Sequence, residues 1–153
     1  MRFFLTLFTV LISFTAFAQS PPAASMPKGN QIALIEEFVK ASHYESSLKK
    51  FGMNYMYSKM FKYENGNNVR ILTNKQADNI LKSFNFNSFK EKSIYNAFSF
   101  VSEDNLKALI KFYRSPNAKM TNFGDLFINN DVIILNFIGY LDKEIEEYTK
   151  DKK

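Results

Sequence analysis

The sequence predicts an all-α protein, an antiparallel helical bundle of about five to seven helices that follows a cleaved signal peptide. Three observations support this fold class. Apolar residues recur at helical spacing over most of the chain after residue 30, as expected of helices that each bury one face. Residue types that begin and end helices interrupt this pattern at short intervals. The 153 residues include no cysteine, so the fold must be stabilised by a hydrophobic core without disulfides.

Residues 1–18 have the organisation of a secretory signal peptide. Arg2 precedes the apolar run Phe3 to Phe14, and Ala16-Phe17-Ala18 forms a small-residue cleavage pattern. The run is shorter than the roughly 20 apolar residues of a membrane-spanning helix. We therefore expect cleavage before Gln19 and a mature protein that is periplasmic or secreted, without a transmembrane segment. Because cysteine is absent, a lipid-anchored lipoprotein is not expected.

Residues 19–29 are rich in Pro, Ala and Ser, which predicts a disordered spacer before a single helical domain at residues 30–150. We expect the first helix to start behind Asn30 as its N-cap and to end near Ser42. A second helix, with a broad apolar face, should run from Tyr44 to Phe61. The interruption at residues 64–68 favours a loop, and Asn65-Gly66 offers a small hairpin over residues 59–72 as the alternative.

Capping patterns predict where the following helices begin. Thr73-Asn-Lys-Gln76 and Ser88-Phe-Lys-Glu91 are capping boxes for the third and fourth helices. Ser102 is a natural N-cap for the fifth, which should end at a sharp corner at Ser115-Pro116. Beyond it, apolar residues keep close to one face as far as Tyr148, which predicts one long final helix, or two if Gly124 and residues 129–131 interrupt it.

The segment Ser102 to Pro116 resembles the signature of an exported bacterial family, the domain of unknown function numbered two thousand and fifty-nine. Ile32 to Leu48 resembles that family's opening helices more weakly, and Ala118 stands where the family commonly has Gly. The resemblance implies an all-helical, exported domain of uncharacterised biochemistry and supplies no catalytic residue. We interpret the signature residues as structural: Ser102, Leu106, Phe112, Tyr113, Arg114, Ser115 and Pro116.

The catalytic groups that the sequence offers are few. The one histidine, His43, lies in a predicted turn between Ser42 and Ser46, and neighbours in sequence rarely form a catalytic triad. The acidic pairs Glu36-Glu37, Glu103-Asp104 and Glu146-Glu147 occupy adjacent helix positions, whose side chains do not face each other. We therefore expect a protein that is not an enzyme and needs no cofactor.

Ligand binding has two weak candidates, both on the predicted second helix. Met53, Met56 and Met60 place three thioethers along one helical face, and thioethers suit Cu(I), although methionine is also a common core residue. Tyr44, Tyr55 and Tyr57 accompany them. This face is either a groove for a hydrophobic ligand or the centre of the bundle, and we favour the centre.

The net charge of +5 is carried by lysines interspersed with acidic residues, which is typical of a solvated surface and does not favour nucleic acid as a partner. We expect a protein-interaction or binding module of the bacterial envelope, whose partner is an unidentified envelope protein. Ile134 and Phe137 of the final helix are the expected contacts. The alternatives are a carrier of a hydrophobic ligand or lipid along the second helix and, less favoured, a Cu(I)-binding protein.

Overall fold

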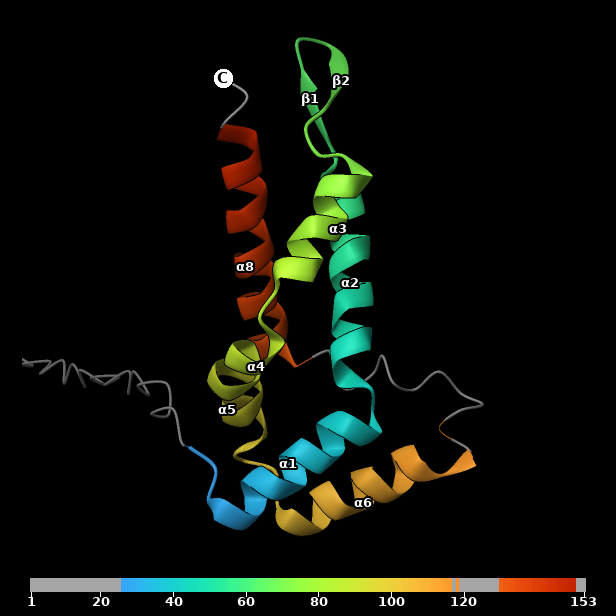
Figure 1. Cartoon of the computed structure of the whole chain (residues 1–153), viewed down its shortest axis with the longest axis vertical. Helices are drawn as coiled ribbons and strands as arrows, with labels where there is room; N and C mark the ends of the chain where they lie inside the picture. Colours follow the sequence, from blue (N-terminus) through green and yellow to red (C-terminus); the bar gives the residue numbers. More distant parts are fainter. Residues whose placement is uncertain (1–25, 117, 119–129, 151–153) are drawn as a thin grey trace, which may run out of the picture.

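The computed structural model describes residues 26–116, 118 and 130–150. Two groups of helices make up most of this structure (Figure 1). Three stand side by side along the long axis: α2 (Tyr44–Lys59), α3 (Asn74–Ser83) and α8 (Asp131–Lys150). Two lie side by side across the lower end: α1 (Gly29–Ala41) and α6 (Glu103–Arg114). A further helical segment joins the groups, in the order α4 (Phe86–Phe89), the π-helix η1 (Lys90–Ile94) and α5 (Tyr95–Phe98).

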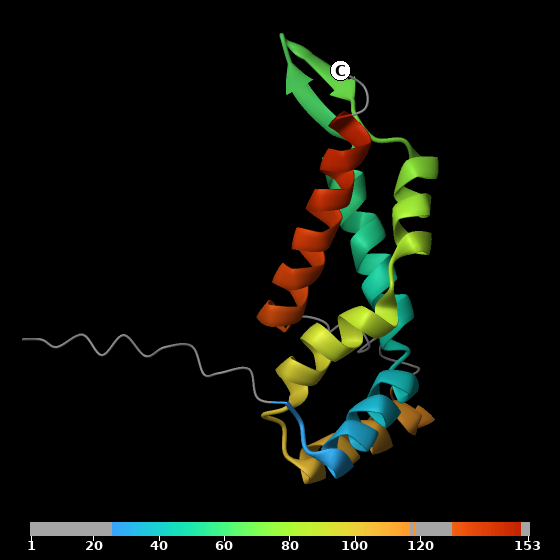
Figure 2. The same cartoon turned by 60° about the vertical axis from the view of Figure 1, so that its left-hand side comes forward.

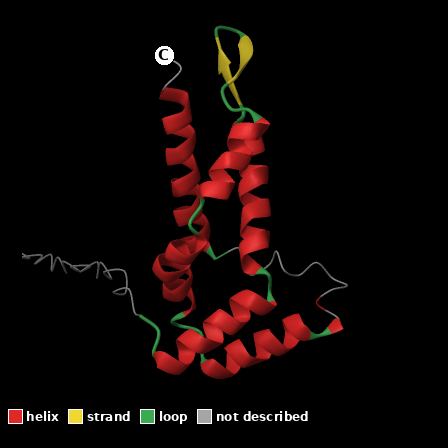
Figure 3. Cartoon of the chain, viewed as in Figure 1, coloured by secondary structure: helices red, strands yellow, loops and turns green. Residues whose placement is uncertain are grey.

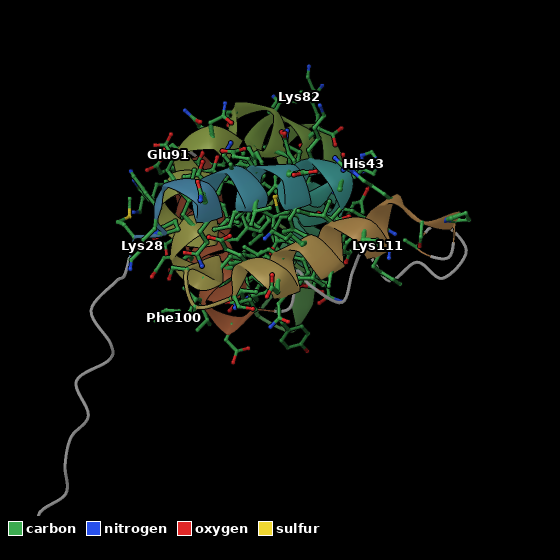
Figure 4. All side chains as sticks on the ribbon, turned by 90° about the horizontal axis from the view of Figure 1, so that it is seen from below. Lys28, His43, Lys82, Glu91, Phe100 and Lys111 are labelled. Carbon is green, nitrogen blue, oxygen red and sulfur yellow. The ribbon has the colours of Figure 1, made fainter. Side chains whose placement is uncertain are left out.

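This arrangement confirms the predicted helical bundle, with one small sheet added (Figure 3). The consecutive helices α2 and α3 run antiparallel, whereas α1 and α6 run in the same direction. Seen from below, α1 and α6 lie next to each other, with Lys28 and Phe100 near their starts and His43 and Lys111 near their ends (Figure 4). Within the described ranges, no helix combines the length and the apolar character needed to cross a membrane.

The sheet is a β-hairpin of β1 (Phe61–Glu64) and β2 (Asn67–Arg70), which extends past the helices at one end of the molecule (Figure 2). The favoured prediction of a loop here was wrong, and so was the extension of the second helix to Phe61. Asn65 and Gly66 both have positive φ, 49° and 83°, as a type I′ turn requires. The two strands therefore pair directly across a two-residue turn, with Glu64 opposite Asn67.

The hydrophobic core contains two clusters of aromatic rings. In the lower cluster, Phe38 of α1 contacts Tyr44, Phe98 and Tyr113, with its ring centroid 4.9 Å from that of Phe98. The upper cluster surrounds Phe137 of α8 and draws rings from α2, from the end of α3, from α4 and from α8 itself. Its members around Phe137 are Phe51, Phe84, Phe89 and Tyr140. Each of the two helix groups is therefore stabilised by its own cluster of aromatic rings.

Two of the four predicted N-caps are confirmed, and α2 begins at Tyr44 as predicted. The Thr73 hydroxyl accepts a hydrogen bond from the Gln76 backbone N–H, and the Gln76 side-chain oxygen accepts one from the Thr73 backbone N–H. The Ser102 hydroxyl accepts from the Asn105 N–H. The other two N-caps were wrong: α1 begins at Gly29, ahead of Asn30 and without a side-chain cap. Ser88 lies inside its helical segment, which Asn85 caps by accepting from the Ser88 N–H.

The sequence left open whether the final helix is continuous, and the structure shows an interruption, because Asn130 is not helical. Its side-chain oxygen accepts hydrogen bonds from the backbone N–H groups of Val132 and Ile133, at 3.1 and 3.4 Å. These contacts cap the start of α8 at Asp131. The interruption predicted at residues 129–131 is therefore confirmed at Asn130. Gly124 lies outside the described residues, as do the predicted signal peptide and the spacer as far as residue 25.

Candidate functional site

The signature residues form the packing of α6 on α1 and the end of α6. Leu106 and Tyr113 are buried in the core, and Phe112 packs against it. The Arg114 guanidinium lies 2.7 Å from a carboxylate oxygen of Glu37 on α1. Ser115 is extended, its hydroxyl donates to the Phe112 carbonyl at 2.6 Å, and helix resumes at Pro116. These contacts all lie within the fold, as a structural role requires.

The methionines of α2 differ in exposure. Met56 and Met60 are buried in the core and Met53 is half-buried. The Met60 sulfur accepts a contact from the Arg70 guanidinium at 3.9 Å. A fixed positive charge beside one thioether opposes the binding of a metal cation there. Elsewhere in the part of the chain that the structure describes, no three His, Cys, Asp or Glu side chains are grouped as metal ligands.

The aromatic face of α2 is largely covered by other helices. Tyr44 is buried beside Phe38, and the Tyr55 hydroxyl donates to Asp142 of α8 at 2.7 Å. Burial, together with this hydrogen bond, raises the pKa of Tyr55. Tyr57, by contrast, is exposed. The structure therefore packs α2 against both α3 and α8, and a central position of this helix is the arrangement favoured from the sequence.

His43 and Ser42 are neighbours in sequence but differ in exposure. His43 is exposed and has left-handed backbone conformation (φ 52°) at the start of α2. The hydroxyl of Ser42 is buried and donates to the Phe38 carbonyl at 2.8 Å. This hydroxyl is therefore engaged in ending α1.

Glu36 has an unpredicted polar role between α1 and the π-helical segment. It lies 2.7 Å from the Lys90 ammonium and accepts a hydrogen bond from the Tyr95 hydroxyl. Burial opposes the charged carboxylate, but the hydrogen bonds from Lys90 and Tyr95 outweigh burial and lower the pKa of Glu36. Burial and the bond to Glu36 raise the pKa of Tyr95 to about 12. This network joins two elements that lie far apart in sequence.

The two residues of α8 that we expected to contact a partner are partly or fully covered by the core. Phe137 is fully buried, and Ile134 is half-buried against the core. Val132 and Leu135 are the exposed large apolar residues of α8. A partner that binds α8 would therefore meet a different pair of side chains.

Two exposed aromatic side chains lie close together on the hairpin. Tyr63 is 73% exposed and Phe61 is 55% exposed. Because side chains alternate along a strand, these two rings share one face of the hairpin. The Arg70 guanidinium lies over the Phe61 ring, 5.6 Å from its centroid. Sequence reasoning missed this site, for which the Asn65-Gly66 turn was the available signal.

The opposite face of the hairpin carries alternating charge and borders a cleft. Lys62 and Glu64 form an ion pair at 2.6 Å on this face. The cleft has a volume of about 490 Å³ and separates the hairpin from the last turns of α8, where Glu146 and Lys150 line it. Its walls thus carry both signs of charge, which does not suit a purely apolar ligand.

A smaller pocket, of about 260 Å³, lies beside the π-helix. Its apolar walls are rings of the upper aromatic cluster, and its polar groups come mainly from the helical segment that follows α3. The residues that line it are Phe84, Asn85, Ser88, Phe89, Lys92, Ser93, Asn136 and Tyr140. Asn136 donates to the buried Ser93 hydroxyl at 3.1 Å, which ties α8 to the π-helix.

No family model matches this chain, and comparisons with curated proteins and with solved structures find no match either. The resemblance of residues 102–116 to the exported bacterial family therefore stays a prediction. The hairpin is the element whose exposed side chains have no role in the packing of the fold.

Proposed function

We propose that this protein is an exported, non-catalytic interaction module of the bacterial envelope, and that its β-hairpin binds an extended segment of a partner polypeptide. The main evidence for this proposal is the exposure of Phe61 and Tyr63 on a hairpin that extends past the helices. The signal-peptide pattern and the family resemblance support export. The absence of a catalytic arrangement in the sequence supports a binding role.

The backbone of the hairpin supports this mode of binding. A sheet of two strands has two outer edges, and each edge presents backbone N–H and C=O groups that no strand of the same sheet pairs. An extended peptide that lies along such an edge satisfies these groups and adds a strand to the sheet. Every residue of β1 and β2 is exposed, so the edges are not buried under the helices.

The side chains support recognition of a polypeptide. Aromatic residues and arginine are enriched among the residues that dominate binding energy at protein interfaces. Phe61, Tyr63 and Arg70 gather on one face of this small sheet. A peptide strand added at the edge would place alternate side chains beside these groups. A lone exposed ring needs no explanation, but two rings and a guanidinium on one projecting element favour a contact surface.

Site-specific photo-crosslinking in cells of the host tests this proposal. Tyr63 is replaced with a photo-reactive phenylalanine analogue. The control position is Lys143 on α8, whose side chain is 74% exposed. We expect a discrete polypeptide adduct from position 63 and none from position 143. Adducts formed equally at both positions, or with lipid in place of protein at position 63, would contradict the proposed function.

A further inference from the structure

We propose that one partner of the hairpin is a second copy of this chain, bound along β1 so that the two hairpins form one continuous sheet. The two-fold axis of this dimer passes beside Tyr63 of each copy. The inference rests on the proposed function, because it treats the hairpin edge as a strand acceptor, and it identifies the occupant of that edge.

The backbone fixes which residues of β1 face outward. The Ile71 N–H donates to the Met60 carbonyl at 2.9 Å, so Met60 and Ile71 are a hydrogen-bonded pair. Along an antiparallel ladder such pairs alternate with pairs that are not hydrogen-bonded. Given the observed register, Lys62 with Val69 is bonded, whereas Phe61 with Arg70 and Tyr63 with Asn68 are not. The backbone groups of Phe61 and Tyr63 therefore point away from β2.

Charge selects the register of the added strand. An antiparallel copy must pair outward residues with outward residues. An axis at Tyr63 places Lys62 of each copy opposite Glu64 of the other, which gives two cross-strand ion pairs. An axis at Lys62 would oppose two lysines, and an axis at Glu64 would oppose two glutamates. The pair already present between Lys62 and Glu64 at 2.6 Å would then join a network of four alternating charges.

The other face of the paired sheet is aromatic. In the register centred on Tyr63, the two Tyr63 rings are directly opposite, and Phe61 of each copy lies diagonal to Tyr63 of the other. Aromatic cross-strand pairs stabilise sheets by roughly 0.2–1 kcal/mol each. Pairing would therefore cover the two exposed rings of the hairpin, those of Tyr63 at 73% and Phe61 at 55%.

The surroundings favour β1 over β2 as the pairing edge. The cleft beside α8 is bordered by Lys62 and Glu64 of β1 and by Val69, Arg70 and Ile71 on the β2 side, so the residues next to α8 come more from the β2 side of the hairpin than from β1. The β2 sequence, Asn67-Asn68-Val69-Arg70, has no acidic residue to pair with Arg70 of a second copy. Because the contact is small, we expect a weak, reversible dimer of the kind found below about 1,200 Å² of buried surface.

Sedimentation equilibrium of the purified mature protein, from about 10 μM to about 1 mM, tests this inference. We expect a concentration-dependent dimer. Lys62→Glu alone and Glu64→Lys alone should each weaken it about tenfold or more, because each creates two like-charge pairs. The double variant Lys62→Glu/Glu64→Lys should dimerise again. A mixture of the two single variants should form a heterodimer, because their reversed charges are complementary.

The matched control reverses an exposed pair on α8, Lys143 with Glu147. Lys143→Glu and Glu147→Lys should leave the dimer unchanged. A monomer at every concentration, or a dimer indifferent to charge at positions 62 and 64, would overturn the inference. In the cellular crosslink from position 63, an adduct with a second copy reports self-association and an adduct with a different polypeptide reports the proposed function, so the two fail separately. Circular dichroism of each variant confirms that the helices remain folded.

Discussion

At the scale of single residues, Gly52 sets how closely α2 approaches α8. A Cβ at this position would lie 2.8 Å from Cε1 of Phe137 and 3.1 Å from a methyl carbon of Leu81. The Phe137 ring is fully buried among other rings and cannot move aside easily. Glycine is therefore required here by packing, although it is a weak helix former.

We predict that Gly52→Ala lowers the free energy of unfolding by about 1–3 kcal/mol, the usual cost of overpacking a core. Gly139→Ala on α8 is the matched control, because a Cβ there meets nothing within 4 Å. That change should raise the free energy of unfolding by roughly 0.5–1 kcal/mol through helix propensity. Urea denaturation measures both. Equal stability of the two variants would show that α2 and α8 do not meet at Gly52.

Glu36 and Tyr95 make stability depend on pH at both ends of the scale. The lowered pKa of Glu36 means that its stabilising effect is present above its ordinary pKa of 4.5 and is lost as pH falls through the folded value. The raised pKa of Tyr95 acts in the opposite sense. Its effect is present below the ordinary pKa of 10.0 and is lost as pH rises toward about 12.

Thermal unfolding across pH checks this prediction against two conservative variants. Glu36→Gln should lose less stability than the wild type between neutral pH and pH values below 4.5. Tyr95→Phe should lose less between pH 10.0 and about 12. If both variants follow the wild-type profile at both ends, the network among Glu36, Lys90 and Tyr95 does not contribute to folding.

At the scale of elements, the hairpin contributes surface and not core. All residues of β1 and β2 are exposed, whereas Met60 and Leu72, which flank the hairpin, are buried. We predict that replacing residues 62–69 with Gly-Gly leaves the helices folded and shifts the melting temperature by no more than a few degrees. Circular dichroism during heating measures this. Loss of cooperative unfolding would show that the hairpin is part of the folding unit.

Local sequence rules predicted some elements and failed on others for physical reasons. Thr73 and Ser102 begin their helices because each cap is satisfied within one turn of backbone. The π-helix at Lys90–Ile94 has no local signal, since Lys90 and Tyr95 are held by Glu36 on α1. The hairpin was underestimated because strands this short are rarely stable alone, and here two helices anchor their ends.

At the scale of the whole molecule, helical periodicity was sufficient to predict the fold class but not how the helices pack. The pairing of α1 with α6 depends on contacts between segments far apart in sequence. Gln31 donates to the carbonyls of Ser99 and Val101, both at 2.8 Å, and Phe38 packs on Tyr113. For the same reason, sequence reasoning assigned Phe137 to a partner surface, although its apolar stripe forms the core.

The candidate site was even harder to predict from the sequence than the helix packing, because it is defined by which side chains remain exposed. In sequence, Phe61 and Tyr63 resemble the other aromatic residues of an aromatic-rich chain. Only their position on a hairpin beyond the ends of α2 and α3 leaves them exposed. Met56, Met60 and Tyr44, by contrast, are buried in the core and are not accessible to a ligand. Exposure therefore separated the proposed binding residues from the core residues.

The most direct test of the account compares the intact mature protein with the variant that has Gly-Gly in place of residues 62–69. Both are tagged, expressed in the host and recovered under mild conditions after crosslinking. We predict that a specific envelope polypeptide is recovered with the intact protein and not with the variant, while both proteins show the same helical content. Recovery of the same polypeptide in equal amount with the folded variant would contradict the account.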